Sequence, residues 1–220
     1  GTTPATPWAT IQFALGAASG TNPGLVAGDT VWIAPGTYRE VVTTTTLTGA
    51  SGNTIKVYGD PAFTRAWTAG SAGRVRVTNF TIDSALPTAS ATLIINGDYI
   101  EIQDLCIDGH NSGGVTPSVS TNSTVYVTGG NISVTKCSVQ TTATLRQVGI
   151  TWYCTAGKNN FTVDKCSVFA VVGIYAHSTA QTATFDYNAL IKDTFVLTPK
   201  DIGISFEGVS ANQVTGARVY

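Results

Sequence analysis

The segment that decides the fold is Asn131-Ile-Ser-Val-Thr-Lys-Cys-Ser-Val139, because the chain repeats it. It aligns without gaps with Asn160-Phe-Thr-Val-Asp-Lys-Cys-Ser-Val168 and, more loosely, with Tyr99-Ile-Glu-Ile-Gln-Asp-Leu-Cys-Ile107. In each copy apolar residues stand at offsets 1, 3, 6 and 8, so the alternation breaks at a two-residue corner and then resumes. This pattern predicts two short strands that meet at a bend.

The repeat has a regular period. Equivalent positions lie 24 to 32 residues apart, in the series Ile100, Ile132, Phe161 and Phe185. A second motif recurs as Val148-Gly-Ile150, Val172-Gly-Ile174 and Ile202-Gly-Ile204. Such a period, with three short strands per turn, is typical of a parallel β-solenoid, whose coils stack about 4.8 Å apart and bury their apolar faces on one another. We therefore predict an all-β fold, a single-stranded parallel β-helix (β-solenoid) that forms one domain over residues 1–220.

The two ends of the chain carry different signals. Thr6 and Pro7 predict the N-cap and first residue of a short capping helix within residues 1–28, because apolar residues follow at helical spacing: Trp8, Ile11, Leu15 and Ala18. Stacked coils are expected over 29–220. At the other end, 214–219 aligns with 134–139, which predicts an uncapped apolar layer. Either a further segment of the protein or another chain, through self-association, is expected to cover it.

Composition narrows the classes of partner. Of the 220 residues only 11% are charged and 43% are hydrophobic, with a net charge of −1. The hydrophobic fraction excludes disorder, the low charge argues against a nucleic-acid partner, and no apolar run reaches the roughly 20 residues of a membrane span. The polar residues are mainly 36 Thr, 15 Ser and 11 Asn, a surface of hydroxyls and amides that favours an extracellular, cell-surface or virion location.

Four cysteines lie in strand-like segments: Cys106, Cys137, Cys154 and Cys166. They form no Cys-x-x-Cys pair, and the chain has only two histidines, so we expect no metal site. We interpret the cysteines as small buried apolar residues, with disulfides as the alternative. Cys137 and Cys166 are expected to stack in one inward column with Leu105 and Ala217. No Gly-rich phosphate loop occurs, and we expect no cofactor.

Aligning the strand before each bend predicts which side chains share a column. One inward column is expected to hold Leu93, Val125, Trp152, Ala176 and Phe206, and the outward column beside it Ile94, Tyr126, Tyr153, His177 and Glu207. Another outward column is expected to hold Thr92, Thr124, Thr151, Tyr175 and Ser205. This arrangement yields candidate carbohydrate-binding residues, namely Tyr126, Tyr153, Tyr175 and His177, and weaker candidates for proton transfer, namely His177, Glu207 and Tyr153. The alternative is an exposed β-ladder with ordinary cross-strand packing.

Two further groups of polar residues complete the candidates. Asp108 and His110 open a Gly/Ser/Thr-rich stretch that we interpret as a long loop, and such loops often border binding grooves. Asp104, Lys136 and Lys165 share a corner column, which predicts an exposed salt-bridge ladder.

The N-terminal segment resembles a known family. Pro7-Trp-Ala-Thr-Ile-Gln12 and Ala27-Gly-Asp-Thr-Val-Trp-Ile-Ala-Pro-Gly-Thr-Tyr-Arg-Glu40 are similar to the opening of pectate-lyase-like right-handed parallel β-helix proteins. The resemblance implies a right-handed helix and an association with polysaccharides. It does not fix an activity, because the family includes lyases, hydrolases, epimerases, surface proteins and phage tail components.

The catalytic patterns of that family are not found in this sequence. Its calcium-dependent lyases use clustered Asp and Glu with an Arg or Lys base, and its polygalacturonase-type hydrolases use paired Asp and a Gly-His-Gly. We therefore expect an extracellular or virion-surface β-helix with a structural or carbohydrate-facing role and no catalysis in this segment. The alternative is a polysaccharide lyase or glycoside hydrolase of the same fold.

Overall fold

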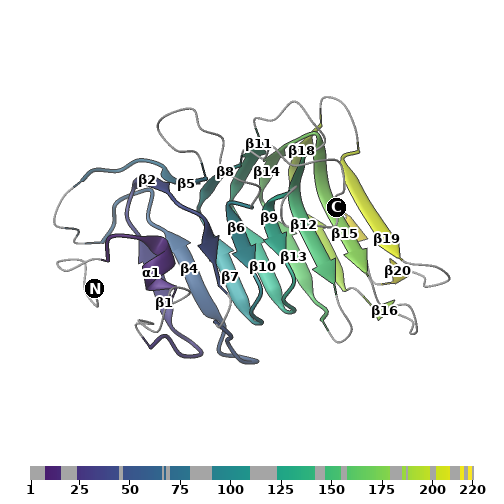
Figure 1. Ribbon diagram of the computed structural model, residues 1–220, viewed down its shortest axis with the longest axis horizontal. Coiled ribbons are helices and arrows are strands. Elements are labelled where there is room, and N and C mark those ends of the chain that lie inside the picture. Colours follow the sequence, from purple (N-terminus) through teal and green to yellow (C-terminus); the bar gives the residue numbers. More distant parts are fainter. Residues whose placement is uncertain are drawn as a thin grey trace.

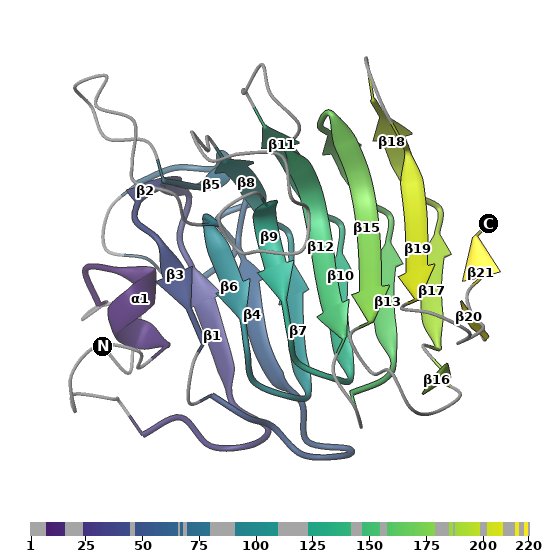
Figure 2. The ribbon, with the colours of Figure 1, turned by 45° about the vertical axis from the view of Figure 1, so that its right-hand side comes forward.

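A computed structural model describes residues 8–15, 24–44, 47–65, 67, 70–79, 91–109, 123–141, 147–154, 158–178, 185–186, 188–198, 202–208, 214–215 and 218–219. Its strands lie side by side in successive coils that progress from the N-terminal to the C-terminal end of the molecule (Figures 1 and 2). Every strand ladder among these residues is parallel. The predicted all-β parallel β-helix is thereby confirmed.

Each coil contributes one strand to each of three sheets. Sheet A has the order β1 (Thr30–Ile33), β4 (Ile55–Gly59), β7 (Ile100–Gln103), β10 (Ile132–Thr135), β13 (Phe161–Asp164), β17 (Ala189–Lys192) and β21 (Arg218–Val219). Sheet B has the order β2 (Gly36–Arg39), β5 (Val75–Thr78), β8 (Cys106–Gly109), β11 (Ser138–Thr141), β14 (Ser167–Phe169) and β18 (Phe195–Leu197). Sheet C has the order β3 (Val42–Thr43), β6 (Leu93–Ile95), β9 (Ser123–Val127), β12 (Val148–Cys154), β15 (Val172–Ser178) and β19 (Ile204–Gly208). A separate pair joins β16 (Phe185–Asp186) and β20 (Val214–Thr215).

The core is made of stacked inward columns. In sheet A, Ile100, Ile132, Phe161 and Ala189 follow one another in register and all are buried. The sequence alignment was wrong in placing Phe185 in this column, because β16 belongs to the separate two-stranded pair. Alternating burial along most of the strands shows that the apolar period of two places one face of each sheet inside.

The cysteines are confirmed as unpaired residues. All four are free, and Cys137, Cys154 and Cys166 are buried while Cys106 is partly exposed. Cys137 and Cys166 lie in the same inward column as Leu105, as the repeat predicts, since Cys106, Ser138 and Ser167 are in register just after them. Ala217 lies outside the described residues.

Residues in the left-handed backbone region form the corners of the coils. Between sheets C and A these are Tyr99, with φ of 54°, and then three asparagines, Asn131, Asn160 and Asn188, with φ of 56°, 59° and 44°. Their side chains also form a ladder, in which Asn160 Nδ2 donates to Asn131 Oδ1 (2.7 Å) and Asn188 Nδ2 donates to Asn160 Oδ1 (2.8 Å). Asn tolerates positive φ better than most residues, so the repeated Asn marks a backbone requirement.

The corner between sheets A and B uses the same conformation. Asp104, Lys136, Lys165 and Asp193 have φ of 57°, 49°, 53° and 46°. The predicted salt-bridge ladder is wrong: within the described part of the chain Asp104 accepts a hydrogen bond from Gln103, and no ion pair joins Asp104, Lys136 and Lys165. Backbone geometry therefore aligns these corner residues, and charge pairing does not.

A short helix lies at the N-terminal end of the stack (Figure 2). The helix α1 spans Ile11–Ala14, and Thr10 is its N-cap, with Oγ1 accepting from the Phe13 N–H at 3.1 Å. The predicted start at Thr6 and Pro7 was therefore too early, and those two residues lie outside the described part. Ile11 and Leu15 are buried against the first coil, as expected of a cap.

The opening segment and the second strand of the chain are joined through this helix. Glu40 accepts hydrogen bonds from the backbone N–H groups of Ile11 (2.9 Å) and Gln12 (2.8 Å), two of the groups that a helix start leaves without partners. Gln12 and Glu40 belong to the two segments that carry the family resemblance. These two segments therefore contact each other where the helix packs on the first coil.

The alignment of 214–219 with 134–139 was wrong. Val219 pairs with Ile191 in sheet A, which puts it in line with Val134 rather than Val139. Val214 belongs to β20, outside the three main sheets. The predicted uncapped end rests on residues 214–220, of which 216–217 and 220 lie outside the described ones, so it stays a prediction. None of the helices in the described ranges has the length and apolar character needed to cross a bilayer.

Candidate functional site

The outer face of sheet C carries the aromatic residues that the sequence singles out. Tyr126 is in register with Thr151, and Thr151 is in register with Tyr175. Tyr153 and His177 form the next column along the strands. The predicted alignment of Tyr126 directly beside Tyr153 was therefore wrong by two residues, because the pairing of β9 with β12 matches Val125 with Ile150.

The rings nevertheless meet across this offset. Tyr126 and Tyr153 have centroids 6.2 Å apart with ring planes at 27°, and Tyr153 and His177 are 5.4 Å apart at 22°. These are offset-stacked arrangements of the kind that aromatic pairs prefer. All three side chains are partly exposed. We call Tyr126, Tyr153 and His177 the aromatic row.

The environment of Tyr126 favours its uncharged form. Burial, followed by the proximity of Tyr153, raises the pKa of Tyr126 to about 12. Its phenol is therefore protonated at neutral pH and can donate a hydrogen bond. An uncharged phenol of this kind is suited to a neutral polar ligand.

Tyr175 does not lie exposed beside the row, as the sequence alignment had placed it. Only 4% of it is accessible, and it packs with Val148 and Val172 in a small cluster separate from the main core. Its hydroxyl is 3.2 Å from Nδ1 of His177, and the two rings are nearly parallel, at 11°. Tyr175 therefore helps to position His177 through its hydroxyl and is almost inaccessible to solvent.

The hydroxyl column beside the aromatic row also differs from the prediction. Thr92, Thr124 and Thr151 are all buried. The register places Thr124 opposite Gly149 and not opposite Thr151. These hydroxyls are thus part of the packing, and Thr92 Oγ1 donates to the carbonyl of Asp108 at 2.8 Å.

The remaining predicted site residues lie in different places. The backbone of Glu207 is in register with His177 across β15 and β19, but its side chain is outside the described residues, as is the whole of His110. Asp108 was wrongly assigned to a loop. It belongs to β8, is 1% exposed, and forms an ion pair with Arg76 of β5.

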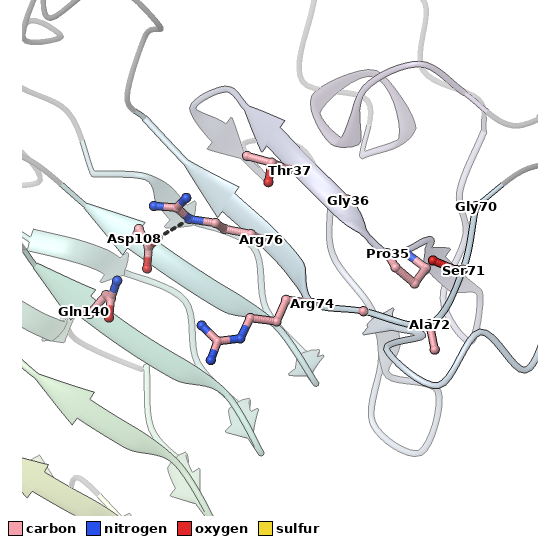
Figure 3. A pocket seen from close by; sticks show the side chains of 11 residues that line it. Pro35, Gly36, Thr37, Gly70, Ser71, Ala72, Arg74, Arg76, Asp108 and Gln140 are labelled. Carbon is pink, nitrogen blue, oxygen red and sulfur yellow. Dashed lines mark hydrogen bonds and ion pairs between the residues drawn. The ribbon is translucent and has the colours of Figure 1, made fainter.

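That ion pair belongs to a second candidate site, on the outer face of sheet B. An open hollow of about 690 Å³ is lined by residues of β2, β5, β8 and β11 and by the segment before β5. Its charged and amide side chains are Arg74, Arg76, Asp108 and Gln140 (Figure 3). We call it the sheet B hollow. Neither arginine was predicted as a site residue, although the alternation Arg74-Val-Arg-Val77 places both on one outward face.

In the described ranges no three His, Cys, Asp or Glu side chains lie close enough together to hold a metal ion.

In comparisons with protein-family models, with curated proteins and with solved structures, none matches this chain. The strand order thus establishes a parallel β-helix, and membership of the pectate-lyase-like family stays an expectation from the opening motif.

Proposed function

We propose that this chain is a structural β-helix of a cell or virion surface that binds a neutral polysaccharide along sheet C without cleaving it. The observation that supports the proposal is the aromatic row, three near-parallel rings on neighbouring strands. Strand spacing of about 4.8 Å makes such a row continuous along the solenoid axis, so that an extended glycan can follow it.

The chemistry of the row suits sugar hydroxyls. The three side chains are partly exposed, so their uncovered parts can meet C–H groups of a pyranose, and the protonated Tyr126 hydroxyl can donate to a sugar oxygen. Each aromatic contact is expected to contribute about 0.5–1.5 kcal/mol beyond area burial. Several weak contacts in line give useful affinity for a polymer and little for a monosaccharide.

We propose that the polysaccharide is not cleaved because of the kinds of side chain on the outer face of sheet C. Proton transfer to a glycosidic bond uses paired carboxylates, and elimination from an acidic sugar needs stabilisation of developing negative charge. The described side chains of the outer face of sheet C are aromatic rings, hydroxyls, an isoleucine and the imidazole of His177. The imidazole is held beside the Tyr175 hydroxyl.

The direct test is a screen of neutral oligosaccharides followed by titration calorimetry with the best ligand. We expect Tyr126→Ala and Tyr153→Ala each to weaken binding several-fold while the melting temperature changes little. Tyr58→Ala is the matched control, because Tyr58 lies on the outer face of sheet A, where it packs edge-on against Trp32 at 5.3 Å. Binding that survives both row substitutions, or that Tyr58→Ala weakens equally, would refute the row as the binding surface.

Catalysis is tested separately. Wild-type protein incubated with the polysaccharide ligand is expected to release no new reducing or unsaturated ends. Product formation that His177→Ala abolishes while binding is retained would overturn the non-catalytic proposal and favour the lyase or hydrolase alternative.

A further inference from the structure

The sheet B hollow carries an ion pair whose buried partner is a carboxylate. Arg76 Nε donates to Asp108 Oδ2, and the side chain of Asp108 is 1% exposed whereas that of Arg76 is 39% exposed. A buried carboxylate without a partner is strongly unfavourable, so Asp108 fixes the guanidinium in place. Only Nε is used in this contact, and the two Nη groups of Arg76 carry further N–H donors.

A second guanidinium shares the hollow. Arg74 is exposed, and in the described part of the chain its guanidinium has no hydrogen-bond or ion-pair partner. Figure 3 shows its side chain extending toward the amide of Gln140, on the same side as the Arg76–Asp108 pair. The carboxylate of Asp108 balances one of the two guanidinium charges. One positive charge therefore remains in the hollow, although the chain as a whole has a net charge of −1.

A thiol lies beside the Arg76–Asp108 ion pair. Cys106 lies beside Arg76 in register, and its Sγ is 3.8 Å from Asp108 Oδ1. Burial and then Asp108 raise the pKa of Cys106, while the charges of Arg74 and Arg76 act in the opposite direction. Both guanidiniums line the same hollow, and the charges of both act on this neighbouring thiol.

We propose that the sheet B hollow binds an oxyanion, a carboxylate or a sulfate or phosphate group of a ligand, between the guanidiniums of Arg74 and Arg76. A guanidinium presents its N–H groups as a planar fork that matches two oxygens of such an anion. Asp108 acts as a positioning residue that holds the Arg76 fork, and the amide of Gln140 provides a further donor at the edge. The site is on a different sheet from the aromatic row and does not depend on the proposed function.

The main test uses side-chain NMR with sodium sulfate and sodium acetate as probes, at an ionic strength held constant with sodium chloride. We expect a saturable shift of the Arg76 Nε–H resonance in wild-type protein. Arg74→Gln is expected to weaken it about tenfold, the loss that follows from removing a charge-assisted hydrogen-bond donor. A response to sulfate alone identifies the ligand group as tetrahedral, and one to acetate alone identifies it as a carboxylate.

The matched control is Arg65→Gln. Arg65 is also exposed, but its Cζ lies 3.8 Å from the ring centroid of Trp32, on sheet A. This variant is expected to bind both probes like the wild type. No saturable shift with either probe, or equal affinity in the Arg74→Gln variant, would overturn the proposal.

Alkylation of Cys106 supplies an independent readout. The other three cysteines are buried, so labelling of the folded protein reports on Cys106. A bound anion offsets the arginine charges that favour the thiolate, and we expect it to slow labelling saturably in wild type and only at about tenfold higher anion concentration in the Arg74→Gln variant. Slowing to the same extent in both proteins would contradict binding at this site. Arg76→Gln is not used as the decisive variant, because it leaves Asp108 buried without its partner.

Discussion

The side chain of Gln12 exchanges two hydrogen bonds with the backbone of Thr43. Its Nε2 donates to the Thr43 carbonyl at 3.3 Å, and its Oε1 accepts from the Thr43 N–H at 2.6 Å. Thr43 belongs to β3, the edge strand of sheet C. A primary amide thus takes the place of a neighbouring strand, which protects an edge that would otherwise pair with other chains.

Replacing Gln12 is therefore expected to loosen the cap and expose this edge. Gln12→Met keeps the approximate volume but removes both hydrogen bonds, and we expect a loss of about 1–3 kcal/mol in the free energy of unfolding. Urea denaturation measures the loss, and hydrogen exchange at the Thr43 N–H locates it. Unchanged exchange at Thr43 in this variant would show that the amide pairing does not protect the edge.

Asp60 provides a pH-dependent contribution to stability. Its carboxylate accepts hydrogen bonds from the Thr64 N–H and hydroxyl, the Arg65 N–H and the Trp67 Nε1–H, all at 2.8–2.9 Å. Burial alone raises the pKa of this carboxyl, but the four hydrogen bonds outweigh it and lower the pKa from 3.8 to about 2. The carboxylate is therefore more stable in the folded than in the unfolded protein.

The direction of the pH dependence of stability follows from this difference between the folded and unfolded pKa of Asp60. The stabilisation is fully present above the unfolded pKa near 3.8 and is lost as the pH falls toward 2. Asp60→Asn replaces one acceptor oxygen with a donor, so we expect it to destabilise the protein at pH 7 by about 1–3 kcal/mol. Melting curves from pH 7 to 2 are expected to be less pH-dependent for this variant than for wild type. Parallel curves for both proteins would contradict this role of Asp60.

Trp152 and Tyr153 are neighbours in β12 and lie on opposite faces, Trp152 in the core and Tyr153 on the outer surface. Trp152 is fully buried, stacks on Phe161 with centroids 5.2 Å apart, and donates from Nε1 to the Gly129 carbonyl at 3.1 Å. We expect Trp152→Ala to cost roughly 3–5 kcal/mol through the cavity it leaves. Tyr153→Ala, one residue away on the outer face, is the control, and chemical denaturation that shows equal losses for both would contradict the assigned faces.

Tyr175 is expected to behave like the core, contrary to its position in the sequence alignment. Because it is 4% exposed and packs with Val148 and Val172, Tyr175→Ala should lower the free energy of unfolding by about 3–5 kcal/mol, as for other buried aromatic residues. Thermal and urea denaturation measure this loss. A variant as stable as Tyr153→Ala would show that the ring is not packed.

The Asn ladder combines backbone strain with side-chain hydrogen bonding, and two substitutions at Asn160 separate them. Asn160→Gly removes the two ladder hydrogen bonds but accepts the φ of 59° without strain. Asn160→Ala removes the same bonds and is also strained, by roughly 1 kcal/mol at such a backbone angle. We therefore expect Ala to be the less stable variant in urea denaturation. Ala more stable than Gly would contradict a left-handed requirement at this corner.

The sequence by itself determined the coil. Alternating apolar residues such as Ile132 and Val134 must turn to one side of a strand, and Asn131 and Lys136 mark the corners where the strand direction changes. These relationships are local, because they depend on the side-chain period of two and on backbone angles within a few residues. The parallel β-helix, the inward-facing residues of each strand and the free cysteines could therefore be predicted, whereas the predicted inward column of Val125 with Trp152 was wrong, because Val125 pairs with Ile150.

Only the tertiary structure decided which outward residues meet. The register between β9 and β12 places Tyr126 beside Thr151, and the ion pair of Arg76 with Asp108 joins residues of successive coils. The burial of Tyr175 likewise could not be predicted from strand alternation. Register between coils depends on how turns of unequal length bring the next strand back, and a shift of two residues keeps every apolar side chain inside. The hydrophobic pattern therefore specifies the face of each residue but leaves its cross-strand neighbour to the packing of the whole chain.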